Sequence, residues 1–204
     1  MVKKCMAATL AASFLAVFFV AVSFISLSAT PAFSGERTLL GLSFPEEKQV
    51  AGKTLKLNGL AYRKAFGFIK VYVAGLYLEN PSSNASEVIE SEQVKYLETR
   101  YLTSKATGKK LRNGFIEIIE ECNTSKMVAA HRADIDRYAS WLDKDMAPGL
   151  SSSSLYIPGK GLTLTYQGVV KGTIAGSEFA QMYYRYNVGE KASKKIKKGL
   201  LGIK

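Results

Sequence analysis

Two adjacent strand-like runs, residues 54–66 and 68–79, constrain the fold more than any other part of the chain. Along the second run the alternating residues are almost all apolar: Val71, Val73 and Gly75 on one side, and Tyr72, Ala74, Leu76 and Leu78 on the other. A strand with two apolar sides is covered on both faces of its sheet. We therefore expect a central strand at 68–79, paired with 54–66 as a hairpin.

The rest of the chain places strands and helices in separate groups. Apolar runs bounded by turn residues predict further strands at 94–102, 155–157, 161–166 and 169–174, and a leader strand or loop at 35–53. Apolar residues at helical spacing predict helices at 85–91, 103–123, 126–144, after Ser177 and at 191–201. Ser151–Ser154 is expected to be loop. This order favours an α+β fold, an antiparallel sheet covered on one face by a layer of helices, with a ligand cleft between them.

The first 34 residues have the layout of a secretory signal. Lys3 and Lys4 precede a long uncharged apolar run, and small residues follow it up to Ser34. This layout predicts a signal peptide at 1–34, with cleavage after Ser34 or Ala32, and a single exported domain at 35–204. The domain is then expected in the periplasm or outside the cell. The alternative is an uncleaved membrane anchor, because about 20 apolar residues can span a bilayer.

The net charge and the cysteines limit the function classes. The whole chain carries +11 at pH 7, and loss of Lys3 and Lys4 leaves 26 basic against 17 acidic residues, or +9. For an exported chain this charge favours an acidic ligand or an anionic membrane surface over nucleic acid, unless it is simply a solvated basic surface. Cys122 has no partner cysteine after cleavage, and no metal-ligand spacing, phosphate loop or dinucleotide fingerprint is present, so we expect neither metal nor cofactor.

Arg63 is the first candidate for a binding residue. It lies in the first strand of the hairpin among aromatic and aliphatic neighbours. An arginine in such surroundings stays charged and needs an anionic or strongly polar partner. That partner is either a bound ligand or a carboxylate of the chain, with Glu117 and Glu121 as candidates, and a simple surface position is the remaining alternative.

Two groups of motifs resemble a known family. The first comprises Leu57-Asn58-Gly59, Arg63-Lys64, Phe66 and the strand Lys70–Leu78; the second comprises Pro158–Gly161, Gly172–Ile174, Phe179-Ala180, Gly189–Lys191 and Lys197–Gly202. Together they resemble the bacterial version of the chalcone isomerase-like family over most of residues 38–202. One departure is Val188 before Gly189, where relatives usually carry a tryptophan.

The resemblance implies a fold but only part of an active site. Catalytic chalcone isomerases carry an arginine that corresponds to Arg63, a threonine that falls on Tyr72, and a helical tyrosine and asparagine that fall near Leu111 and Ile118. Two apolar residues there would leave the substrate unoriented. The departures favour a binder, and Arg63 and Tyr72 are catalytic candidates only if the protein is an enzyme.

The fatty-acid-binding branch of the family implies a different use of the same position. There an arginine and a tyrosine hold a carboxylate at one end of an apolar tunnel, and Arg63 with Tyr72 would reproduce this pair. The ligand-binding candidates also include four aromatic wall residues, Phe66, Phe68, Tyr77 and Phe115. Each of these, and Tyr72, has ordinary core packing as its alternative.

Three functions follow as hypotheses. The first is an exported, non-catalytic binder of a fatty acid or similar amphipathic carboxylate. The second is an intramolecular lyase or isomerase acting on an enone or polyphenol-like ligand. The third is a module that binds an anionic membrane surface through Lys191–Lys204, where lysines alternate with Ile196, Leu200 and Leu201.

Overall fold

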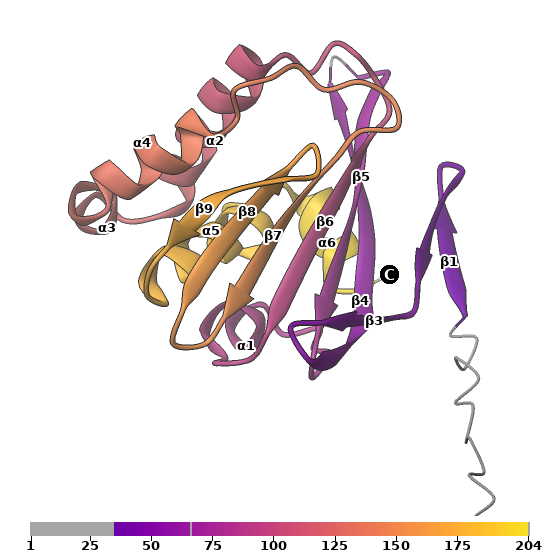
Figure 1. Cartoon of the computed structure of the whole chain (residues 1–204), viewed down its shortest axis with the longest axis horizontal. Helices are drawn as coiled ribbons and strands as arrows, with labels where there is room; N and C mark the ends of the chain where they lie inside the picture. Colours follow the sequence, from indigo (N-terminus) through magenta and orange to yellow (C-terminus); the bar gives the residue numbers. More distant parts are fainter. Residues whose placement is uncertain (1–34, 66, 204) are drawn as a thin grey trace, which may run out of the picture. The chain divides into compact units, whose positions relative to one another are not determined.

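Seven strands form one antiparallel sheet in which each strand pairs with the next along the chain (Figure 1). They are β3 (Glu47–Val50), β4 (Lys53–Ala65), β5 (Ile69–Leu78), β6 (Lys95–Tyr101), β7 (Ser151–Ile157), β8 (Gly161–Tyr166) and β9 (Val169–Ile174). β1 (Glu36–Leu39) and β2 (Leu42–Pro45) form a separate hairpin. This computed structural model describes residues 35–65 and 67–203, so the expected signal peptide and Phe66 lie outside the described residues.

Residues 35–65 and 67–203 contain six helices, which follow or interrupt the strands. They are α1 (Ala85–Glu90), α2 (Gly108–Cys122), α3 (Ser125–Ala130), α4 (Arg132–Ser140), α5 (Glu178–Val188) and α6 (Lys194–Leu200). Figure 1 shows α5 and α6 behind the sheet and α2, α3 and α4 as a group beside β9. Within the described residues, no helix is long and apolar enough to cross a membrane.

The central strand β5 is covered on both faces, as its two apolar sides predict. Ala74, Leu76 and Leu78 belong to the large core beneath the helices, whereas Val73 and Tyr77 belong to a second cluster on the opposite face. Phe44 of the β1–β2 hairpin packs there so closely that a Cβ on Gly75 would lie 2.9 Å from its ring. The hairpin therefore supplies the cover that β5 needs on its second face.

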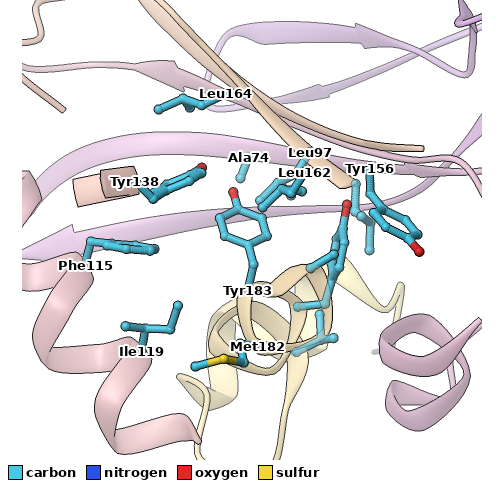
Figure 2. Close-up of a cluster of buried hydrophobic side chains, with 14 of the residues drawn as sticks. Ala74, Leu97, Phe115, Ile119, Tyr138, Tyr156, Leu162, Leu164, Met182 and Tyr183 are labelled. Carbon is cyan, nitrogen blue, oxygen red and sulfur yellow. The ribbon is translucent and has the colours of Figure 1, made fainter. Parts of the chain in front are cut away.

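Aromatic side chains fill the core between the sheet and the helices. The ring of Tyr138 on α4 lies 4.8 Å from that of Phe115 on α2 and 5.7 Å from that of Tyr183 on α5, measured between centroids. Figure 2 shows Tyr138 and Tyr183 with their hydroxyls directed toward Ala74 on the sheet. The helical layer thus presents tyrosines, rather than aliphatic residues alone, to the inner face of the sheet.

The outer face of the sheet holds the N-terminal hairpin by polar contacts. Arg100 on β6 donates to the Ser43 carbonyl at 2.7 Å and places its guanidinium 4.3 Å from the Phe44 ring centroid. The same side chain donates to Glu98, which also accepts from Lys48 on β3. Because each charged group is paired, the attraction between the charges offsets part of the desolvation cost of burying them.

The two ends of the fold meet at a pair of glycines. A Cβ on Gly59 of β4 would lie 2.1 Å from the Gly199 carbonyl oxygen, and a Cβ on Gly199 would lie 2.5 Å from the Leu60 carbonyl oxygen. Beside them, Asn58 forms a bulge in β4 and donates to the Leu200 carbonyl at 2.8 Å. The first group of motifs, in β4, and the end of the second group, in α6, are therefore in direct contact, because α6 lies on β4.

Lys95 at the start of β6 is a buried cation. Its side chain is 1% exposed, donates to the Ile89 carbonyl at 3.0 Å, and lies 5.2 and 4.9 Å from the ring centroids of Tyr156 and Tyr184. Burial lowers the pKa of Lys95 to about 8, against a smaller opposing effect of Glu92. The amine of Lys95 is therefore neutral in about half of the folded molecules at a pH of about 8.

Three predicted elements differ from the structure. Ser151–Ser154 was expected to be loop but opens β7, because backbone pairing with β6 and a 2.7 Å hydrogen bond between Ser154 and Tyr138 outweigh the turn preference of serine. The helix expected at 126–144 is two helices that meet at His131, whose ring bonds to Asp134 and Glu178. The helix expected from residue 103 begins at Gly108, after the Thr107 cap.

Candidate functional site

Three neighbouring cavities lie between the sheet and the helices. The outer cavity, of about 270 Å³, is lined by Arg63, Tyr72, Ile118, Glu121, Tyr186, Asn187, Lys191, Ser193 and Ile196. The inner cavity, of about 80 Å³, shares Tyr72, Tyr186, Asn187 and Ile196 with the outer one and continues toward Tyr138, Tyr183 and the sheet. The side cavity, of about 180 Å³, is lined by Arg63, Ala65, Ile69, Val71, Thr103, Lys105, Ala106, Lys110 and Leu111.

Arg63 and Tyr72 are brought together by the register of the sheet. They are direct partners across β4 and β5, so their side chains leave the sheet on the same face. The next pair is Lys64 with Lys70, so Val71 is an extra residue and β5 bulges beside the site. Bulges commonly re-aim side chains next to functional sites. Here the bulge lies where Arg63 borders both the outer and the side cavity.

Tyr72 is a partly buried phenol held beside a cation. Burial raises its pKa, and the charge of Arg63 and a hydrogen bond to it oppose the rise. The phenol is therefore neutral at pH 7. A phenolic oxygen that accepts from Arg63 can still donate its own proton to an anion. The pair can thus offer a carboxylate both a guanidinium and a hydroxyl donor.

Arg63 forms no ion pair with a carboxylate in the part of the chain that the structure describes. Among residues 35–65 and 67–203, no acidic group lies within 4.0 Å of its guanidinium, although Glu121 lines the same cavity. The expected alternative pairing with Glu117 or Glu121 is therefore not formed. Arg63 and Lys191 against Glu121 leave the lining of the outer cavity with an excess of positive charge.

The inner cavity is rich in hydroxyls. Thr99, Tyr101, Ser152 and Ser154 reach it from the sheet, and Tyr138, Tyr183 and Tyr186 reach it from the helices. Burial raises the pKa of each of these four tyrosines, so all are neutral donors at physiological pH. The side cavity contrasts with it, because Ala65, Ile69, Val71, Ala106 and Leu111 make most of its wall apolar.

The expected wall residues divide into two groups. Phe115 lines the inner cavity with Tyr72. Tyr77 is fully buried but lies in the cluster on the opposite face of the sheet, and Phe68 is 76% exposed in the connection between β4 and β5, so neither lines a cavity. Phe66 is outside the described residues. Of the candidates, the structure therefore brings together Arg63, Tyr72 and Phe115.

Helix α2 places two apolar side chains in the cavities. Leu111 lines the inner and side cavities, and Ile118 lines the outer cavity. Both were expected near positions where catalytic relatives carry tyrosine and asparagine. In this chain the α2 side of the cavities presents aliphatic groups there.

Several residues that line the cavities were not predicted from the sequence. Tyr138, Tyr183 and Tyr186 were assigned only to helix packing, Lys191 only to the membrane-surface hypothesis, and Asn187 and the serines of β7 to no site. Tyr183, Tyr186 and Asn187 occur at helical i, i+3 and i+4 spacing, so three residues with polar groups on one stripe of this helix were the available signal.

The C-terminal helix does not have the free apolar face that membrane insertion requires. Ile196, Leu200 and Leu201 are buried in the core against β4. In the described part of Lys191–Lys204 these three side chains are therefore not available to a bilayer, and binding of the lysines to an anionic surface stays a prediction. Within the described residues, no group of three or more His, Cys, Asp or Glu side chains is arranged to hold a metal ion.

Fold and cavities together define an α+β protein with a curled antiparallel sheet, helices packed against it, and an arginine at the junction of two cavities. A family model described as chalcone isomerase-like matches residues 36–202, so the chain belongs to the chalcone isomerase-like family.

A solved structure supports the same fold. The crystal structure of the Arabidopsis thaliana fatty-acid binding protein AtFAP1 is similar, with a TM-score of 0.66 and 15% sequence identity over 82% of this chain and 96% of that chain. At this identity the likeness concerns the fold. No curated protein matches the sequence.

Proposed function

We propose that this protein binds a small amphipathic carboxylate, such as a fatty acid, with the carboxylate held by Arg63 and Tyr72. The observation that carries the proposal is a partly buried arginine that borders two cavities and has no acidic partner among the described residues. A guanidinium forms strong charge-assisted hydrogen bonds with a carboxylate. The similar fold of AtFAP1, which is a fatty-acid binding protein, supports the same ligand class.

The side cavity is the place for the apolar part of the ligand. Its wall is largely aliphatic and begins at Arg63 itself. Each buried methylene contributes about 0.8 kcal/mol, so an aliphatic tail there would add to the affinity that the charge supplies. The outer cavity, with Lys191 and Ser193, remains accessible to water or to polar groups at the head of the ligand.

The isomerase alternative has less support. A catalytic site of this kind needs polar groups on α2 to orient the substrate, whereas Leu111 and Ile118 are aliphatic where they line the cavities. Export after removal of residues 1–34 also remains a proposal, supported by the sequence of that segment. The intact mass of the protein purified from its host would show whether cleavage occurs.

Replacing Arg63 tests the carboxylate site. Arg63→Met keeps an apolar stem and removes the charge, so dodecanoate should bind about 10- to 150-fold more weakly, as expected for loss of hydrogen bonds to a charged group. Isothermal titration calorimetry measures this. Arg137→Met, on the exposed surface of α4, is the matched control and should bind like wild type.

A second ligand separates charge recognition from loss of packing. Dodecanol has the same tail without the carboxylate, so wild type should bind it about as weakly as Arg63→Met binds dodecanoate. The variant should lose little affinity for dodecanol. Equal binding of acid and alcohol by wild type, or unchanged binding of the acid by Arg63→Met, would contradict the proposal.

A further inference from the structure

One end of the sheet collects exposed lysines. β4 ends and β5 begins there, and the register carries the same edge across β6, β7 and β8 through Tyr72 with Tyr101, Arg100 with Ser151, and Ser152 with Tyr166. Six exposed lysines lie at this edge or in the loops and first helical turn beside it: Lys64, Lys70, Lys105, Lys109, Lys110 and Lys144. We call this region the basic end.

The charge of the basic end is largely uncompensated. Within the described part of the chain, none of the six lysines forms an ion pair. The two nearby acids are already engaged: Asp143 pairs with Lys171 at 2.8 Å, and Asp145 accepts from the Gly108 amide at 2.9 Å. The opposite end of the sheet carries Glu87 and Glu90 on α1. The basic end is therefore a positive surface without local ion pairs, although exposed lysines such as Lys56 and Lys160 also occur elsewhere.

Exposed apolar side chains occur at the same end. Of the four large hydrophobic residues that are exposed in the described chain, Phe68, Val169 and Val170 lie at this edge, with 76%, 54% and 66% of their surface exposed. Phe68 lies between Lys64 and Lys70, which pair across β4 and β5. An exposed aromatic flanked by lysines is suited to the interface of an anionic bilayer, where the ring enters the headgroup region and the amines meet lipid phosphates.

We propose that the basic end docks on an anionic membrane surface, with Phe68 inserted and Lys64, Lys70, Lys105, Lys109, Lys110 and Lys144 around it. Exposed apolar groups at the same end of the sheet favour a lipid surface over nucleic acid, which would use the lysines but leave the two valines in water. The side cavity is bordered by Lys105 and Lys110, so it lies beside the docked surface. If the cavity binds a ligand as proposed above, the docked protein could exchange that ligand with the bilayer. The docking itself does not depend on the proposed function.

Vesicle flotation measures the docking. The compact unit Ser34–Lys204 contains the whole family match, so it is the chain to use, free of the apolar N-terminal run. We expect binding to equimolar phosphatidylcholine and phosphatidylglycerol, little binding to phosphatidylcholine alone, and weaker binding as salt is raised. The double variant Lys64→Gln/Lys70→Gln should lose about 25-fold in partitioning, since each lysine near an anionic surface is worth about fivefold.

A matched pair distinguishes a docking surface from general charge attraction. Lys56→Gln/Lys160→Gln removes two exposed lysines near the other end of the strands, about 30 Å away for a ten-residue strand and beyond the Debye length at physiological salt. This control should change partitioning by less than about threefold. Equal losses in the two double variants would overturn the proposal.

Fluorescence tests the insertion of residue 68. The chain has a single tryptophan, Trp141, so Phe68→Trp adds one reporter. Its emission should shift to the blue with anionic vesicles, while wild type changes little. No shift, or no vesicle binding by wild type, would overturn the proposal, and lysine-dependent binding of single-stranded RNA instead would point to nucleic acid. Arg63→Met should still bind vesicles, so failure of the ligand proposal is seen separately.

Discussion

Gly59→Ala is expected to destabilise the fold by about 3 kcal/mol, the upper part of the range for an added group in a close-packed site. The new Cβ would lie 2.1 Å from the Gly199 carbonyl oxygen, which is backbone and cannot rotate away. Either α6 or β4 must shift, and the contacts of Leu200 and Asn58 shift with it. Urea denaturation of wild type and variant measures the loss of unfolding free energy, provided that this free energy depends on urea concentration with the same slope in both proteins.

Two further variants make this prediction specific. Gly114→Ala, in the middle of α2 with nothing within 4 Å of its new Cβ, should instead stabilise the protein by about 0.5–1 kcal/mol through helix propensity. Gly199→Ala should destabilise like Gly59→Ala, and the double variant should cost less than the two together because both disturb one contact. A stability of Gly59→Ala within about 0.5 kcal/mol of wild type, the usual range for harmless surface changes, would contradict the close approach.

The second large effect is a pH dependence caused by Lys95. In the unfolded chain a lysine titrates near pH 10.4, as model peptides do, whereas burial lowers the pKa of Lys95 to about 8 in the fold. Between these values the unfolded state binds more protons, so the free energy of unfolding rises with pH. Relative to Lys95→Met, which cannot titrate, wild type should gain about 2 kcal/mol between pH 7 and pH 10.

The comparison with Lys95→Met removes other titrations from the result. Burial raises the pKa of Cys122 and of many tyrosines, which lowers stability at alkaline pH, but these groups are present in both chains. Lys160→Met, at an exposed lysine, controls for removal of a positive charge. Urea denaturation over the pH range gives the two curves. Parallel curves for wild type and Lys95→Met would show that Lys95 is not a buried titrating group.

The residue pattern was sufficient to predict those strands of the sheet in which buried and exposed residues follow the two-residue period of a strand. The two apolar sides of β5 predicted a central strand, and the structure covers that strand with helices on one face and Phe44 on the other. The serines of β7 could not be assigned in this way, because serine prefers turns and only pairing with β6 shows that they extend a strand. Strand alternation also separates Tyr72 from Tyr77, and the structure places Tyr77 in the cluster on the opposite face of the sheet.

The cavities were predictable only in part, because three or more elements build each of them. Arg63 and Tyr72 could be found as neighbours in a hairpin, whose register is local. Tyr138 and Tyr186 come from α4 and α5, and their position beside Tyr72 depends on how the helices pack. The apolar stripe of α6 has the same pattern whether it docks on a core or on a bilayer. The contact between Gly59 and Gly199 decides this, and it has no local signature.

The docking of α6 on β4 has a consequence for the order of events during synthesis. The hydrogen bond from Asn58 to Leu200 joins residues 142 positions apart, so β4 leaves the ribosome long before its partner exists. Contacts of such long range form late and slow the folding of a domain. Ser193 and Ile196 also complete the outer cavity. A chain synthesised only as far as α5 lacks the helix that covers β4 and part of the wall of the outer cavity, so we expect the proposed ligand to be retained there only after α6 has been made.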